Sequence, residues 1–531
     1  MTNMKRRDFL KMASALSAGR VLPVGFGVTA LAQQAQAVSP DYSALEVKVP
    51  NVMPQVINIF MYGGASELAG NLTNIEEIDA NSVNSYTDAF GAGIVQKAAD
   101  NPTGFQVTDR GCWKDAGGAH MEDMMDDGDM AIYRTIFKKK RATRSHRESI
   151  FMSHKGTVDI EGSPGIGSRL ALMLKNHESE LSATPFPDGQ TLAEISNAGG
   201  TINGLEALTL PFVSFEGDSQ TYATDPENPI PLTLRGLTMD ESFNNPYRRA
   251  DNPNSENAIA SLLSLRETEI ASNSLKYTKA FNGFEDRKNL ETNMDLLRSK
   301  LGLNQAGQKV SDTSAEELLL PLDFNNGTQA YPNTTFGRQV EAAVTLALHN
   351  PQTLYMAMGT PGLGGWDDHN NGVDDYPGRM NDLMEAIKVG MQHIKAAGDK
   401  IGGIETIHNT MRTRTDNIII NVFGDFGRLV NLNNSKGWDH ANNQNLYTFG
   451  GVNKDNIANS VRPPKEAAAM GSVVGTTERQ GTPKTNNQYT VPTSDSPSFE
   501  PMSIAASIYG YFGAVKPELM TSDDKPLEDG L

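Results

Sequence analysis

The strongest constraint on the fold is an alternation of helix and strand patterns across residues 335–428. Apolar residues recur at helical spacing in two of these segments, TFGRQVEAAVTLALHN and YPGRMNDLMEAIKVGMQHIKAAG. Each is followed by an apolar run typical of a strand: TLYMAMGTPGLGG, which ends in glycines, and NIIINVFGDFGR, which is largely apolar in its first half. This order predicts an α/β fold with parallel strands and helices on the faces of the sheet. In such sheets ligands bind in loops beyond the carboxyl ends of the strands.

Other segments extend this pattern. Strands are predicted from Val56 to Met61, before a turn at Gly63 and Gly64, and from Met130 to Phe137. Helices are predicted in SPGIGSRLALMLK and PMSIAASIYGYFG. An insertion or cap is predicted from about residue 215 to 330, where patches of helical pattern occur. A long surface loop is predicted over residues 452–495, and a solvated tail is predicted for the acidic end TSDDKPLEDGL.

The composition predicts a soluble globular protein. Of 531 residues, 38% are hydrophobic and 21% charged, and the formal net charge of −18 argues against nucleic-acid or anionic-membrane partners. The single cysteine, Cys112, cannot form an internal disulfide, so stability is expected to come from core packing and bound metal.

The N-terminus predicts export. MKRRDFLKMASALSAG contains the pair Arg6 and Arg7 before a weakly apolar segment, and AQA follows at Ala35 to Ala37. This pattern is typical of a twin-arginine signal peptide over residues 1–37, with one domain over residues 38–531. The partner would be the twin-arginine export machinery and the destination periplasmic or secreted, with no stable membrane anchor after cleavage. The alternative is an ordinary basic segment leading into a helix.

The stretch GGWDDHNNGVDD follows the strand predicted near residue 355. Asp367 and His369 could reach one ion, because carboxylate oxygen and imidazole nitrogen suit zinc, manganese or iron. The sequence argues against a calcium loop of the EF-hand type, because its third position is His369 and Gly378 stands where the glutamate ligand belongs. Asp374 and Asp375 are expected to be solvated or to cap the next helix.

A second acidic and histidine-containing group follows the last apolar strand. Asp425 ends that strand, where a buried carboxylate needs a metal or a partner, and a salt bridge to Arg428 is the alternative. His440 belongs to a further Asp/His pair, although either histidine could instead be a structural or surface group. A shared metal site predicts that Asp367, His369, Asp425 and His440 place ligand atoms within about 5 Å of one point.

The loop KKKRATRSHRES reverses the sign of charge locally in an acidic chain. Arg144 could hold an anion, and Ser145 could act as a nucleophile if a metal or base activates it. The alternative is that Ser145 caps a helix while the basic side chains are solvated.

Taken together, RRDFLK, FMYGGAS, TRSH, GGWDDHNN, FGDFGR and GWDHANNQNLYTFGG resemble the family known as domain of unknown function 1501, over most of residues 50–515. That family is grouped with alkaline phosphatases and sulfatases. The resemblance implies a three-layer α/β/α sandwich, alkaline phosphatase-like, with a mostly parallel sheet and an ancestral two-metal hydrolase site.

The resemblance also implies roles for single residues. Ser145 lies near the position of the nucleophile, Asp367 and His369 resemble one metal's Asp/His pair, and Asp425 and His440 resemble later ligands. The family's first turn usually reads Gly-Gly-x-Asp, whereas Ser66 and Glu67 follow here, so Glu67 is the candidate for the bridging carboxylate.

These observations lead to two hypotheses. The first is an exported hydrolase of phosphate or sulfate esters, small or polymeric, that uses a divalent metal, with zinc among the candidates. The second is a non-catalytic exported binding or assembly protein that retains the hydrolase fold.

Overall fold

The fold is built on an eight-stranded sheet with the order β4-β3-β5-β1-β6-β7-β2-β8. The computed structural model describes residues 41–72, 74–95, 110–198, 204–225, 228–241, 331–400, 414–479 and 490–531, with isolated positions between 243 and 298. The strands are β1 (Gln55–Met61), β2 (Met130–Phe137), β3 (Phe212–Ser214), β4 (Leu237–Thr238), β5 (Tyr355–Met358), β6 (Ile418–Gly424), β7 (Asn443–Gly450) and β8 (Val473–Val474). A separate pair is formed by β9 (Thr477–Glu478) and β10 (Val491–Pro492).

The sheet is mostly parallel. Strand β7 is antiparallel to both of its neighbours, β6 and β2, and every other pairing among these eight strands is parallel. The carboxyl ends of β1, β5, β6 and β2 therefore lie at the same edge. In the register between β1 and β6, Met61 lies opposite Gly424, so the residues that follow both strands emerge side by side.

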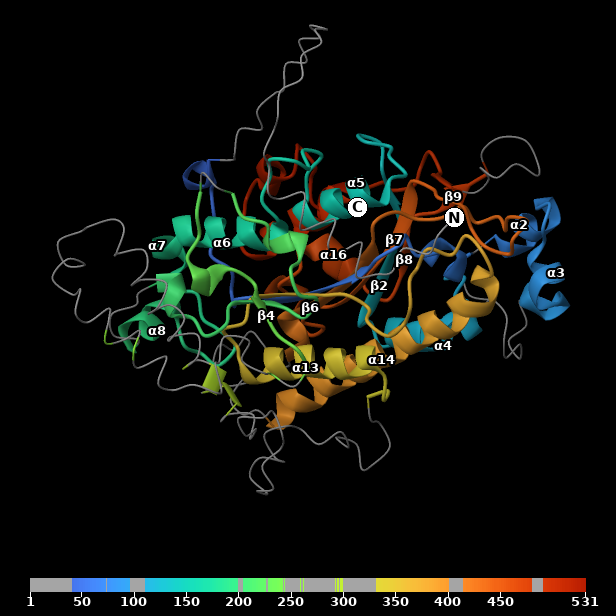
Figure 1. Cartoon of the computed structure of the whole chain (residues 1–531). Helices are drawn as coiled ribbons and strands as arrows, with labels where there is room; N and C mark the ends of the chain where they lie inside the picture. The colour runs from blue at the N-terminus through green and yellow to red at the C-terminus, as the bar shows by residue number, and fades with distance from the viewer. Residues whose placement is uncertain are drawn as a thin grey trace, which may run out of the picture. The chain divides into compact units, whose positions relative to one another are not determined.

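Helices cover both faces of the sheet (Figure 1). On one side lie α4 (Gly118–Asp126), α13 (Thr335–His349) and α14 (Gly372–Lys400), and on the other lie α5 (His146–Lys155) and α6 (Ile166–Asn176). The other α-helices of the described residues are α2 (Ile75–Asn81), α3 (Tyr86–Phe90), α7 (Glu178–Leu181), α8 (Leu192–Ala198), α16 (Pro464–Ala469), α17 (Met502–Tyr511) and α18 (Leu527–Gly530).

Two hydrophobic cores lie on opposite faces of the sheet because side chains alternate along each strand. Along β1, Ile57 and Ile59 pack in the core that contains α13 and α14, whereas Val56 and Phe60 pack in the core that contains α6 and α17. The predicted three-layer α/β/α sandwich with a mostly parallel sheet is therefore confirmed. The central strands β1 and β6 are buried on both faces of the sheet, which explains why their sequences are largely continuous apolar runs.

Three regional predictions need correction. Residues 452–495 are not only a surface loop, because they include α16 and the edge strand β8. The acidic end is not a solvated tail, because Thr521, Asp524 and Leu527 are buried. The first part of the insertion predicted from about residue 215 belongs to the central sheet, because β4 pairs with β3. Most of residues 244–330 lie outside the described residues.

Cys112 is buried and unpaired, as its single occurrence in the chain requires. Within the described ranges, no helix combines the length and the apolar character needed to cross a membrane. The predicted signal segment, residues 1–37, lies outside the described residues.

Candidate metal centre

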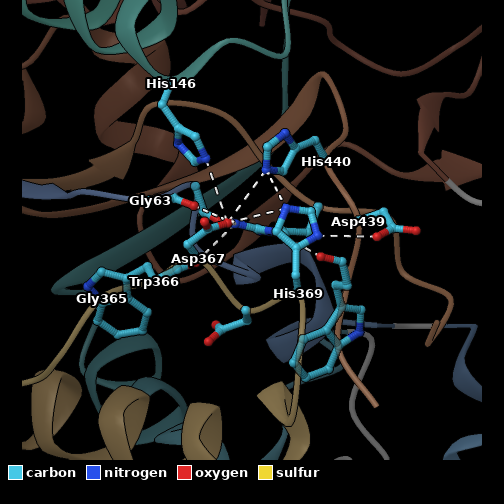
Figure 2. A network of polar contacts seen from close by, with 12 residues as sticks. Gly63, His146, Gly365, Trp366, Asp367, His369, Asp439 and His440 are labelled. Carbon is cyan, nitrogen blue, oxygen red and sulfur yellow. Dashed lines mark hydrogen bonds and ion pairs between the residues drawn. The ribbon is translucent and has the colours of Figure 1, made fainter. Parts of the chain in front are cut away.

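Three histidines surround one carboxylate oxygen at the carboxyl edge of the sheet (Figure 2). Oδ1 of Asp367 lies 3.3 Å from Nε2 of His369 and 3.6 Å from Nε2 of both His146 and His440. The Nε2 atoms of His369 and His440 are 2.7 Å apart. His146, Asp367 and His440 each offer one ligand atom within 4.8 Å of the others. Side chains that are far apart in the sequence thus meet at one point.

The second nitrogen of each of these rings faces an oxygen acceptor. Nδ1 of His146 lies 2.8 Å from Oδ2 of Asp425, and Nδ1 of His369 lies 3.2 Å from Oδ1 of Asp439. Nδ1 of His440 lies 3.1 Å from the carbonyl oxygen of Arg144. Carbonyl and ionised carboxylate oxygens only accept hydrogen bonds, so these partners assign the N–H to Nδ1 in all three rings.

This assignment determines what the Nε2 atoms can do. A neutral imidazole with its proton on Nδ1 carries a lone pair on Nε2, so the Nε2 atoms of His369 and His440 can present lone pairs beside Asp367. Two such lone pairs 2.7 Å apart repel unless a proton or another cation lies between them. His146, whose pKa is raised to about 9, carries a proton on Nε2 near neutral pH, and its lone pair becomes available only when a metal ion replaces that proton. Metal-binding histidines commonly donate their other N–H to a carboxylate or a carbonyl, which is the arrangement seen here.

Phe426 packs against two of the histidines. Its ring centroid lies 4.7 Å from that of His146 and 4.3 Å from that of His440. Nζ of the buried Lys138 lies 4.9 Å from the centroid of the same ring. Burial is the main cause that lowers the pKa of Lys138, to about 7. Phe426 thus packs against two histidine rings that come from separate loops of the chain.

Arg428 connects the loops that form the centre. Its guanidinium is buried and pairs with Oδ1 of Asp367 at 2.5 Å. It also donates to the carbonyl oxygens of Gly64 at 2.6 Å, Gly63 at 2.5 Å and Trp438 at 2.8 Å. These carbonyls belong to the turn after β1 and to the loop that leads to His440. One side chain therefore holds three separate segments in register.

The charges of the cluster shift two pKa values in opposite directions. Hydrogen bonds to Asp367 and then to Asp425 raise the pKa of His146 to about 9. Hydrogen bonds from His146, His440 and Arg428 hold the pKa of Asp367 far below its usual range. The carboxylate of Asp367 is thus ionised and attracts positive charge, which protons or a metal ion can supply.

The structure separates the predicted ligands into two groups. Asp367, His369 and His440 lie together, whereas Asp425 lies behind His146, where its carboxylate orients that ring. The alternative salt bridge between Asp425 and Arg428 is not formed, because Arg428 pairs with Asp367.

The basic loop places its residues at the rim. Ser145 is exposed at the N-cap of α5, but its side chain makes no capping hydrogen bond. Arg144 is exposed, and only its carbonyl oxygen contacts a histidine of the centre. Glu67 begins the 3-10 turn η2 (Glu67–Gly70), and its side chain lies outside what the structure describes.

The acidic stretch 364–375 has several roles. Asp367 is at the centre, while the neighbouring Asp368 is buried and pairs with Arg379. Asp374 and Asp375 are exposed in the first turn of α14, as the prediction of solvated or capping residues expected.

Sequence reasoning missed one member of the centre and misplaced another. His146 was considered only as a neighbour of Ser145, whereas Asp439 was considered as a substitute metal ligand and instead accepts from Nδ1 of His369. A signal was present for His146, since it follows a strand and all such loops were candidates. What the sequence did not reveal is that the β2 loop reaches the loop after β6.

Comparison with known proteins adds no relative: neither a scan against protein-family models nor a search of curated proteins finds a match. The resemblance to domain of unknown function 1501 stays a prediction.

Proposed function

We propose that this protein is a metal-dependent hydrolase of phosphate or sulfate esters. The observation that carries the proposal is the convergence of three Nε2 atoms on Oδ1 of Asp367, with each ring oriented by an acceptor at Nδ1. A divalent cation bound by His146, Asp367 and His440 would replace any proton on the two Nε2 atoms and use the orientation that the Nδ1 acceptors already impose.

The donor set fits zinc best. Imidazole nitrogens and a carboxylate are ligands that zinc accepts, and His146, His440 and Asp367 offer ligand atoms within 4.8 Å of one another. His369, whose Nε2 lies 2.7 Å from that of His440, is the candidate for a fourth ligand. Oδ1 of Asp367, around which the three Nε2 atoms lie, also accepts a hydrogen bond from Arg428. A divalent cation held there would supply Lewis-acid polarisation of an ester oxygen and electrostatic stabilisation of the transition state.

The charge around the centre favours an anionic ester. The other cationic side chains of the loop have structural contacts: Lys140 pairs with Asp524, Arg141 with Glu148 and Arg147 with Glu161, Lys139 lies over Phe137 and Lys138 is buried. Among the described residues, Arg144 makes no ion pair, so its planar guanidinium is available to bind phosphate or sulfate oxygens.

Ser145 is the candidate nucleophile, with a water molecule as the alternative. Its hydroxyl is exposed, and it immediately precedes the ligand His146. In the sequence it stands between Arg144, which would bind the anion, and the proposed ligand His146. The chain therefore brings an anion-binding group, a hydroxyl and a metal ligand into three consecutive residues.

One observation favours a second function, a non-catalytic binding or assembly protein. In the described part of the chain, no imidazole or carboxylate is hydrogen bonded to the Ser145 hydroxyl, so no side chain is placed to remove its proton. Such a protein would keep the metal as a structural ion and bind an anionic group without cleaving it.

Export by the twin-arginine route to the periplasm or beyond is part of the proposal. It is supported by Arg6 and Arg7 within RRDFLK and by the AQA site at Ala35 to Ala37. Processing of the full-length chain in cells, compared with an Arg6→Lys/Arg7→Lys variant, tests it.

Assay of the mature protein tests the catalytic proposal. Zinc, manganese and cobalt would each be added to metal-free protein, and 4-nitrophenyl phosphate and 4-nitrophenyl sulfate would be supplied as substrates. The proposal expects metal-dependent release of 4-nitrophenol that the Asp367→Ala/His369→Ala variant lacks. Stoichiometric metal without turnover of a wide ester panel would favour the second function.

A further inference from the structure

The carboxyl-terminal turn of Ser522, Asp523 and Asp524 packs against the basic loop that precedes α5. Nζ of Lys140 pairs with Oδ1 of Asp524 at 2.7 Å and donates to the carbonyl oxygen of Ser522 at 2.7 Å. The side chain of Asp524 is only 6% exposed. The side chain of Lys140 is 38% exposed, so the pair joins a buried carboxylate to a lysine at the surface.

The same turn contacts the segment that follows α5. The Ser522 hydroxyl lies 2.7 Å from the Thr157 hydroxyl and accepts a hydrogen bond from the Val158 N–H at 3.3 Å. The carbonyl oxygen of Val158 in turn accepts from Arg141 at 2.9 Å. The turn therefore touches the chain on both sides of α5, whose first residue is the proposed ligand His146.

A second carboxylate near the start of α17 acts on the same loop. Oε1 of Glu500 accepts hydrogen bonds from the backbone N–H groups of Lys139 and Lys140, both at 2.9 Å. The backbone of the loop is thus fixed at Lys139 and Lys140, and the Lys140 side chain is fixed by the turn.

The backbone of the turn is in an unfavourable conformation. Ser522 and Asp523 have φ angles of 56° and 64°, in the left-handed region that residues with side chains rarely adopt. Such conformations persist where the surroundings hold them, and they often occur near functional sites.

The contacts lead directly to the candidate metal centre. Four residues after Lys140, the carbonyl oxygen of Arg144 accepts the hydrogen bond from Nδ1 of His440. Movement of the loop would displace this acceptor and His146 together. Two of the three histidines therefore depend on where the loop lies.

We propose that the Ser522–Asp524 turn positions the basic loop, and with it His146 and the acceptor of His440, through the ion pair between Asp524 and Lys140. The inference rests on the proposed function, because it assigns the turn a role in metal affinity. Asp524 and Lys140 are positioning residues, since neither contacts the three converging Nε2 atoms.

The test measures Co²⁺ binding to the mature protein by calorimetry and by the visible spectrum of the bound ion. The variants are Asp524→Asn, which keeps the shape of the side chain, Lys140→Met, and the conservative Lys140→Arg. Asp529→Asn is the matched control, because Asp529 belongs to the same segment and its pair with Lys525, at 3.7 Å, is exposed. Thermal unfolding of each protein shows that it is folded.

The proposal expects Asp524→Asn and Lys140→Met to weaken Co²⁺ binding about tenfold and to alter the spectrum, as loss of groups that orient ligands does. Lys140→Arg and Asp529→Asn should stay within about twofold of the wild type. Lower stability with unchanged affinity and spectrum would overturn the proposal, because the turn would then be structural only.

A second measurement separates this inference from the proposed function. If the wild type binds no Co²⁺, the metal proposal fails, and amide hydrogen exchange over residues 139–146 then tests the positioning. Faster exchange in Asp524→Asn than in Asp529→Asn would support it. Equal exchange in the two variants would overturn it.

Discussion

His369 and His440 face each other through their Nε2 atoms at 2.7 Å, while their Nδ1 atoms face the carboxylate of Asp439 and the carbonyl of Arg144. Both rings therefore have their N–H directed away from the contact. The pair is stable only when a proton or a metal ion occupies the space between the two lone pairs. The predictions below depend on this competition between protons and metal.

The stability of the metal-free protein should depend on the protonation of His146. Its pKa in the folded protein is raised to about 9, whereas an unfolded histidine titrates at about 6.5. A raised folded pKa stabilises the protein fully below pH 6.5, and this contribution is lost as the pH rises through 9. The free energy of unfolding, measured with denaturant from pH 6 to 10, should decline as the pH rises. The difference in this free energy between the wild type and His146→Gln should become smaller over the same range. A difference that stays constant with pH would contradict the assigned ion pairs.

The affinity for metal should depend on the carboxylates behind the histidines. Asp425→Asn and Asp439→Asn each remove the charge that orients a ring, so we expect zinc affinity to fall about 10- to 100-fold with little change in fold. Asp375→Asn is the control, because Asp375 is exposed in the first turn of α14. Competition with a chromogenic chelator measures the zinc affinity of the three variants. Equal zinc affinities in all three would exclude the proposed roles of Asp425 and Asp439.

Arg428→Met should destabilise the protein by about 3 kcal/mol or more, because each buried carbonyl that loses its donor costs about 1–3 kcal/mol. Arg428 serves the carbonyls of Gly63, Gly64 and Trp438 as well as Asp367. Arg147→Met should cost roughly 0.5 kcal/mol or less, since its pair with Glu161 is exposed. Urea unfolding compares the two, and similar losses would refute the connecting role of Arg428.

Arg144→Ala should weaken binding of an anionic ester without loss of metal. We expect KM for 4-nitrophenyl phosphate to rise about tenfold or more, because a charge-assisted hydrogen bond contributes about 1.5–3 kcal/mol. Arg147→Ala, which removes a cation of the same loop that is already paired, should leave KM nearly unchanged. Equal KM values for both variants would show that Arg144 does not contact the anion.

The layers of the fold could be predicted because they follow from local patterns. Strands such as β1 and β6 are buried on both faces and read as continuous apolar runs, and α13 repeats its apolar residues at helical spacing. Strand β7 was not predicted, because Asn443, Gln444 and Asn445 are buried polar residues whose partners are distant in the sequence. The antiparallel direction of β7 was missed with it.

The candidate site could be predicted only in part. Asp367, His369 and His440 stand in loops after apolar strands, which local reasoning can locate. The role of Asp425 behind His146 depends on the strand order β6-β7-β2, which brings the β2 loop near the end of β6. The carboxyl-terminal turn was predicted to be a solvated tail because its composition is acidic. Its contact with Lys140 could not be predicted, since that residue is far from Asp524 in the sequence.

Metal content shows whether the histidines around Asp367 bind an ion. Mature protein purified from its export compartment, and an Asp367→Ala/His369→Ala variant prepared in parallel, would be analysed for metals by mass spectrometry. The account predicts about one equivalent of a divalent metal in the wild type and none in the variant. Metal-free wild type that also fails to take up added zinc, with its fold intact, would contradict it.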